Sequence, residues 1–89
     1  MIEIDKSELS IYEVESLHKD LLAELKNGDI IIDMSNTHKI DMSIIQLFIS
    51  AKKSSMEISK TFELKNLNQE VSKIFQNAGC ETLLGANNE

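Results

Sequence analysis

The sequence predicts a single α/β domain in which helices pack against a mixed or largely parallel sheet. Segments with apolar residues at helical spacing alternate along the chain with short β-branched runs, which is typical of strand–helix–strand units. The 89 residues are enough for one modest core and leave no room for a second domain. We therefore expect one domain over residues 1–89, with a polar tail at 85–89 that frays.

The first elements are short strands followed by a helix. Residues 1–5 alternate apolar and polar side chains, and residues 8–12 continue or pair with that strand after a polar turn. From Glu13, apolar spacing predicts an amphipathic helix, which ends at Asn27 and Gly28 because both residues tolerate left-handed backbone angles. The apolar side of this helix consists of Val14, Leu17, Leu21, Leu22 and Leu25.

The middle of the chain predicts a buried strand and a second helix. Residues 29–34 (DIIIDM) form a β-branched run that is too short for a helix and suits a strand covered on both faces. A polar connection at 35–39 follows. Asp41 is then a good N-cap, because its carboxylate can accept the free N–H groups of the first helical turn. The apolar face of this helix consists of Ile44, Ile45, Leu47, Phe48 and Ala51.

The last third predicts a strand, a helix and a final strand. The strand covers about residues 61–64, and the helix begins near Asn66 or Asn68. Gly79 is suited to the C-cap of this helix, and residues 81–84 (ETLL) form the last short strand. The apolar stripe of the helix consists of Leu67, Val71, Ile74, Phe75 and Ala78.

The composition argues against several classes of protein. A net charge of −6 and the lack of arginine disfavour a nucleic-acid ligand, which is bound largely through Lys and Arg. One cysteine excludes an internal disulfide and a cysteine-based zinc site. No apolar run is long enough for a membrane span, and the first residues lack a signal-peptide pattern. We therefore expect a cytoplasmic protein.

Metal and cofactor sites are not expected either. His18, His38 and Cys80 are the only soft metal-ligand candidates, and neither histidine has a partner at i+3 or i+4. The three glycines are isolated, which excludes a glycine-rich phosphate loop or a dinucleotide fingerprint. We therefore expect no metal and no cofactor.

A serine hydrolase is a further possibility from residue types alone. Ser43, His38 and either Asp33 or Asp41 could supply a nucleophile, a base and an orienting acid. However, no G-x-S-x-G elbow accompanies Ser43, and His38 lies only shortly before it in the same loop. We therefore expect no enzyme activity.

The start of the second helix is the remaining feature. In one reading, Asp41 is a cap and Ser43 is an ordinary polar residue of the first turn. In the other, Ser43 lies where backbone N–H groups and the helix dipole favour an anion, so that a phosphate would be tolerated there. The residue pattern alone leaves both readings open.

The order and spacing of these segments resemble the STAS domain family, which includes the anti-sigma factor antagonists. The resemblance spans about residues 9–84 and depends on two stretches, IIIDMSNTHKIDMSIIQLFISAKK and FELKNLNQEVSKIFQNAGCETLL. It implies a sheet of four or five strands with about three helices largely on one face. It also implies a non-enzymatic bacterial signalling protein that switches between partners.

The resemblance implies a particular site. The family's phospho-acceptor maps onto Ser43, and the partner is a serine kinase/anti-sigma factor of the GHKL type, which phosphorylation releases. Neither nucleic acid nor direct membrane insertion is expected. The implied partner-binding residues are Asp33, Ser35, Asn36, Thr37, His38, Lys39, Asp41, Met42 and Gln46.

Two other binding roles remain open within the same family. The segment LFISAKKSS is similar to the corresponding segment of STAS modules found beside chemotaxis genes, which implies an adaptor role in chemotaxis signalling. The chain could also be a STAS subunit of a membrane lipid-transport ABC complex, in which Ser43 contacts an ATPase without being phosphorylated.

Overall fold

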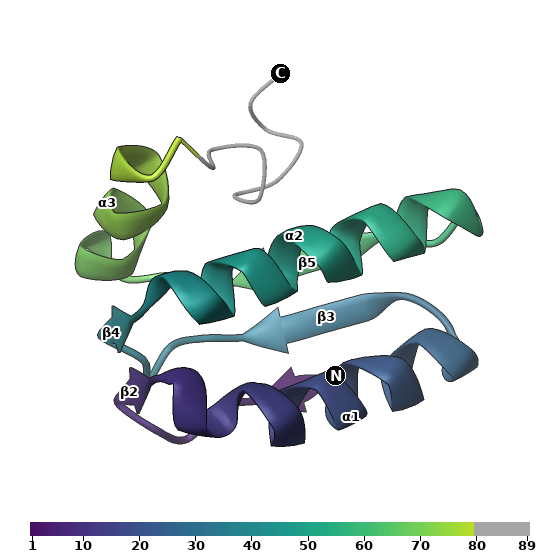
Figure 1. The fold of residues 1–89 in the computed structure, drawn as a ribbon, viewed down its shortest axis with the longest axis horizontal. Coiled ribbons are helices and arrows are strands. Elements are labelled where there is room, and N and C mark those ends of the chain that lie inside the picture. The colour runs from purple at the N-terminus through teal and green to yellow at the C-terminus, as the bar shows by residue number, and fades with distance from the viewer. Residues whose placement is uncertain (80–89) are drawn as a thin grey trace.

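The computed structural model describes residues 1–79 and confirms the α/β class, with three α-helices and five strands in that part of the chain (Figure 1). The helices alternate with the strands as the sequence predicts. In chain order the elements are β1 (Ile2–Glu3), β2 (Glu8–Leu9), the 3-10 helix η1 (Ile11–Glu13), α1 (Val14–Asn27), β3 (Ile30–Asp33), β4 (Lys39–Ile40), α2 (Met42–Glu57), β5 (Phe62–Lys65) and α3 (Gln69–Asn77).

The strands form two parallel groups. A three-stranded sheet has the order β1-β3-β5, and a two-stranded ladder joins β2 to β4. In the larger sheet Ile2 aligns with Ile32, and Ile30 aligns with Phe62. The helices α1 and α2 lie side by side, with β3 visible between them (Figure 1). Each helix therefore serves as a crossover between parallel strands.

The core lies between the central strand and these two helices. Ile30 and Ile32 are buried on one face of β3, and the rings of Phe48 and Phe62 meet at a centroid distance of 5.8 Å. The prediction that β3 is buried on both faces was wrong, because Ile31 on its other face is only half-buried. The buried core consists of Ile4, Leu9, Leu17, Leu21, Ile30, Ile32, Met34, Ile40, Ile44, Ile45, Phe48, Phe62, Leu64, Val71 and Phe75.

The helix boundaries follow the capping signals. Asn68 is the N-cap of α3, and its side chain accepts a hydrogen bond from the backbone N–H of Val71 at 3.0 Å. Gly28 caps the end of α1. Gly79 follows the C-cap residue Ala78 and adopts a φ of 72°, so the expected C-cap was one residue too late. Local hydrogen-bonding chemistry therefore fixes where the helices end.

Two of the predicted strand boundaries and one residue of a predicted helix face differ from the structure. Strand β2 covers only the start of the predicted segment 8–12, because Ser10 caps the 3-10 helix η1. Strand β4 lies at the end of a segment expected to be only a connection. Leu22, which the spacing assigned to the apolar face of α1, is 52% exposed. The predicted final strand at 81–84 lies outside the described residues.

Candidate functional site

Asp41 caps α2 as predicted and at the same time binds the side chain of Ser43. The Asp41 carboxylate accepts a hydrogen bond from the backbone N–H of Ser43 at 2.8 Å, and the Ser43 hydroxyl donates to the same oxygen. Ser43 is half-buried in the first turn. The hydroxyl is thus oriented by the residue that begins the helix.

The charge of Asp41 is stabilised in this position. The hydrogen bond from the Ser43 side chain is the main factor that lowers the pKa of Asp41, and the backbone N–H groups of Ser43, Ile44 and Ile11 add to it. Partial desolvation opposes the shift without reversing it. A carboxylate therefore lies directly beside the Ser43 hydroxyl at neutral pH.

The start of α2 is held against the N-terminal part of the chain. The backbone N–H of Asp41 donates to the carbonyl of Leu9 at 3.2 Å, immediately after the β2–β4 ladder. In that ladder Leu9 aligns with Ile40, and both side chains are buried. The register of two short strands thus fixes the position of the capping residue.

The loop at 35–39 begins with a turn around Asp33. One carboxylate oxygen of Asp33 accepts the backbone N–H of Ser35 at 2.9 Å, and the other accepts the Asn66 amide at 3.2 Å. The Ser35 backbone N–H is the main cause of the lowered pKa of Asp33. Asp33 is half-buried, and through these two hydrogen bonds it stabilises the start of the loop.

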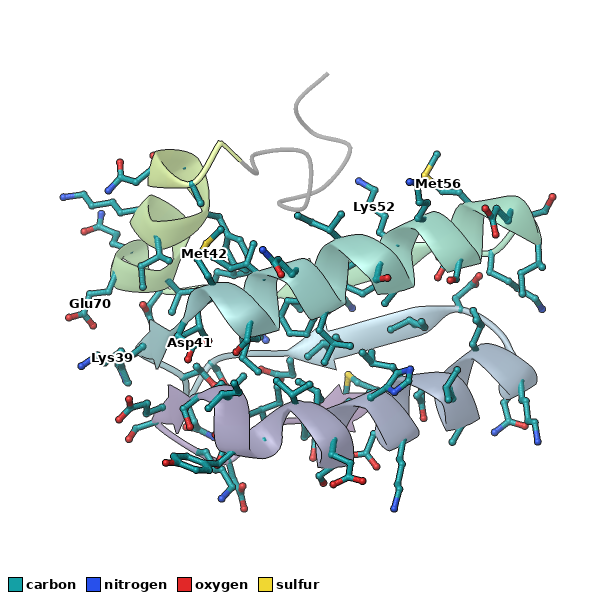
Figure 2. The ribbon with its side chains drawn as sticks, in the orientation of Figure 1. Lys39, Asp41, Met42, Lys52, Met56 and Glu70 are labelled. Carbon is teal, nitrogen blue, oxygen red and sulfur yellow. The ribbon has the colours of Figure 1, made fainter. Side chains whose placement is uncertain are left out.

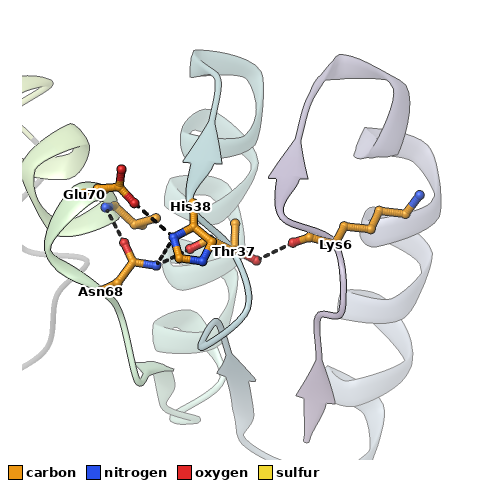
Figure 3. A network of polar contacts seen from close by, with 6 residues as sticks. Lys6, Thr37, His38, Asn68 and Glu70 are labelled. Carbon is orange, nitrogen blue, oxygen red and sulfur yellow. Dashed lines mark hydrogen bonds and ion pairs between the residues drawn. The ribbon is translucent and has the colours of Figure 1, made fainter.

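Thr37 anchors the middle of the same loop inside the protein. It is fully buried, and its hydroxyl donates to the carbonyl of Lys6 at 3.0 Å (Figure 3). Its own carbonyl accepts a hydrogen bond from the Asn68 amide. Thr37 was expected to contact a partner, but its buried side chain has no surface to offer. A β-branched side chain with one hydroxyl suits an internal anchor of this kind.

His38 faces α3 rather than Ser43. Its Nδ1 lies 2.9 Å from a carboxylate oxygen of Glu70 and 3.4 Å from the Asn68 amide nitrogen (Figure 3). The backbone N–H of His38 donates to the carbonyl of Ser7 at 2.8 Å. A histidine engaged with Glu70 is not placed to act as a base for Ser43. The residue types of a serine hydrolase are present but are not assembled here.

Several of the other expected partner-binding residues lie around the start of α2. Figure 2 shows Lys39, Asp41 and Met42 at the same end of the molecule, and Glu70 lies at this end too. We call this region, at the N-terminal end of α2, the α2 end. Its exposed members are His38, Lys39, Asp41, Met42 and Gln46. Ser35 and Asn36 are also exposed, but they line a hollow together with Glu3, Asp5 and Asp33.

Sequence reasoning missed two residues near this end. Ile11 and Tyr12 were assigned to a strand but form part of η1, with their side chains exposed. The signal for this was present in the text SIYE, in which Ser10 and Glu13 have the spacing of a capping box. That motif predicts a helical start rather than a strand.

The described residues form an acidic hollow beside the loop at 35–39. This hollow of about 350 Å³ at the ends of β1 and β3 has an acidic lining that includes Glu3, Asp5 and Asp33, which does not suit a phosphate. Within residues 1–79, no three His, Cys, Asp or Glu side chains are grouped so that they could hold a metal ion. Over the same residues, every helix is too short or too polar to cross a membrane.

The comparison with known families agrees with the fold and with the order of the motifs. A family model described as "Mlab, STAS domain" matches residues 6–85, which is most of the chain. No curated protein matches the sequence. STAS domains are generally not enzymes. The chain therefore belongs to the STAS domain family.

Proposed function

We propose that this STAS domain is a binding module of the anti-sigma factor antagonist type, controlled by phosphorylation of Ser43. The observation that carries the proposal is the hydroxyl of Ser43 in the first turn of α2, next to an exposed surface of polar and apolar residues. The unphosphorylated form binds a serine kinase/anti-sigma factor through this α2 end. Phosphorylation by that kinase releases it.

The chemistry of the transfer fits the position of Ser43. The Ser43 oxygen attacks the γ-phosphorus of ATP, ADP leaves, and the hydroxyl proton passes to the catalytic base of the kinase. The hydroxyl must first give up its hydrogen bond to Asp41 and rotate toward solvent. The hydrogen bond that Asp41 accepts from the backbone of Ser43 can persist during this rotation, so the helix keeps its cap.

A phosphate on Ser43 weakens binding for two physical reasons. It adds about −1.5 to −2 charge beside the ionised Asp41, in a chain whose net charge is already −6. A partner that covers this group must remove its water, which is unfavourable by several kcal/mol unless new cationic contacts replace it. The positive end of the helix dipole at the start of α2 favours the added charge, so the fold survives while the interface is lost.

The test uses the neighbouring kinase, by which we mean a serine kinase of the GHKL type that the proposal expects to be encoded beside the gene for this protein. Incubation with MgATP should add one phosphate by intact mass, and Ser43→Ala should abolish the addition while Ser54→Ala does not. Calorimetry should then show that Ser43→Asp binds the kinase at least about tenfold more weakly than Ser43→Ala. Ser54→Asp is the matched control, because Ser54 is exposed on the same helix. A phosphate at another residue, or equal binding by the two Ser43 variants, would contradict the proposal.

A second candidate function uses the same surface without phosphorylation. The Ser43 hydroxyl already donates to Asp41 and is half-buried, an arrangement that also suits a fixed contact residue. In this role the domain is an adaptor subunit of a chemotaxis complex or of a membrane lipid-transport ABC complex. It predicts that no neighbouring kinase modifies Ser43, and that Ser43→Ala weakens binding to the complex instead of preserving it.

A further inference from the structure

An exposed apolar turn precedes α1 near the proposed site. It consists of Ile11 and Tyr12, whose side chains are 62% and 88% exposed, and we call it the apolar turn. Single exposed apolar residues are common on protein surfaces, but two large neighbours on one short turn concentrate apolar area. Tyrosine is also enriched among the residues that dominate binding energy at interfaces.

The apolar turn is held rigidly. The backbone N–H of Ser10 donates to the Glu13 carboxylate at 2.6 Å, and the Ser10 hydroxyl accepts the backbone N–H of Tyr12 at 3.3 Å. Lys6 lies 3.8 Å from the other oxygen of Glu13. This capping box fixes the backbone from which both apolar side chains project. A surface that is already ordered loses little conformational entropy when it binds.

The apolar turn is joined directly to the start of α2. The carbonyl of Leu9 accepts the backbone N–H of Asp41, and the backbone N–H of Ile11 is one of the groups that stabilise the Asp41 carboxylate. A typical protein interface covers about 800 Å² on each partner. A partner that covers Ser43 therefore also reaches the apolar turn and the exposed side chain of Met42.

The exposed charges that flank the apolar turn in the sequence are negative, although Lys39 is aligned with Glu8 in the β2–β4 ladder. Glu8 and Glu15 precede and follow it in the sequence, and both are exposed. Neither forms an ion pair with another residue of the described part of the chain. Unpaired carboxylates at the border of an apolar patch are complementary to a recess that has an apolar floor and basic residues at its rim.

We infer that the apolar turn is a docking element for the serine kinase that acts on Ser43. Ile11 and Tyr12 insert into an apolar recess of the kinase with a basic rim, outside its catalytic centre. This docking holds the Ser43 hydroxyl near the bound ATP without taking part in phosphate transfer. The inference rests on the proposed function, since it concerns the same partner.

The experiment measures steady-state phosphorylation of Ser43 by the purified neighbouring kinase, with intact mass as the readout. The test variant is Ile11→Ser/Tyr12→Ser. The matched control is Leu22→Ser/Ile58→Ser, because Leu22 and Ile58 are 52% and 51% exposed and line one hollow between α1 and the end of α2. Circular dichroism and thermal unfolding first establish that both variants are folded. Tyr12→Phe tests whether the ring or its hydroxyl matters.

A docking role predicts that the substitutions change KM but not kcat. The test variant should raise KM by about tenfold with kcat within about twofold, because truncation of an interface anchor weakens binding and not chemistry. The control and Tyr12→Phe should keep the wild-type KM. An unchanged KM in the test variant, or an equal increase in the control, would overturn the docking inference and leave the phosphorylation of Ser43 intact. Failure of the kinase to modify even the wild-type chain would instead refute the proposed function, and the docking inference with it.

Discussion

The carboxylate of Asp41 accepts two hydrogen bonds from Ser43, one from its backbone N–H at 2.8 Å and one from its hydroxyl. The N-cap residue of α2 therefore also controls the orientation of the proposed phospho-acceptor. Helix stability and the reactivity of the site depend on the same side chain. Substitutions at Asp41 and Ser43 should accordingly not have additive effects, because the two residues are in direct contact.

The first prediction concerns this cap. Asp41→Ala should reduce the free energy of unfolding by about 0.5–2 kcal/mol, because the first turn of α2 loses its acceptor. Asp41→Asn should keep most of the stability, since asparagine is also a good N-cap. Urea denaturation of the three proteins measures the difference. If Asp41→Ala unfolds at the wild-type midpoint, the side chain does not stabilise the helix.

The second prediction compares the two faces of β3. Ile32 is fully buried under the helices, so Ile32→Ala should reduce stability by about 2–5 kcal/mol. Ile31 is half-buried on the opposite face, and Ile31→Ala should have a clearly smaller effect. Equal losses in the two variants would mean that both faces are covered in solution.

The third prediction concerns the internal anchor of the loop. Thr37→Val keeps the shape of the side chain but leaves the Lys6 carbonyl without its donor, which should reduce stability by about 1–3 kcal/mol. Hydrogen exchange should also become faster at the backbone N–H groups of His38 and Lys39, which donate to Ser7. Thr61→Val is the control, because Thr61 is exposed. Unchanged exchange in Thr37→Val would show that the loop does not depend on this hydrogen bond.

The fourth prediction is a loss of stability in acid. Hydrogen bonds lower the folded-state pKa of Asp33 (mainly from the Ser35 backbone) and of Asp41 (mainly from the Ser43 side chain). Because the folded pKa is the lower one, this stabilisation is complete above the unfolded value of about 4 and is lost as the pH falls through the folded pKa. Asp33→Asn should flatten this part of the stability curve, whereas Glu63→Gln, at an exposed position on β5, should not. Denaturation at a series of pH values below 5 measures the slopes, and identical slopes in wild type and Asp33→Asn would contradict the prediction.

The sequence predicts the parts of this fold that depend on neighbouring residues. Asp41 and Asn68 are visible as caps because each acts on the turn that follows it, and Gly28 is visible because of its backbone freedom. Strand β4 was missed because two residues carry no periodicity, and its existence depends on β2. The burial of Thr37 likewise depends on the carbonyl of Lys6, which is distant in the sequence.

The candidate site was predicted in part for the same reason. The cap at Asp41 and the position of Ser43 in the first turn can be predicted from the local sequence, and the structure places the two side chains in contact. The engagement of His38 with Glu70 depends on how α3 packs, which no local pattern shows. The apolar turn could have been found from its capping box, but the β-propensity of isoleucine and tyrosine favoured a strand.

The parallel pairing of all described strands has a consequence for how the chain folds. No strand pairs with its nearest neighbour in the sequence: β1 joins β3, β2 joins β4, and β3 joins β5. Every ladder must close a loop that contains a helix, so no hairpin can nucleate the sheet early. During synthesis, β3 has only one of its two partners until β5 has left the ribosome. A nascent chain that ends after α2 therefore leaves one edge of its central strand unpaired, which makes that stage the most exposed to misassembly.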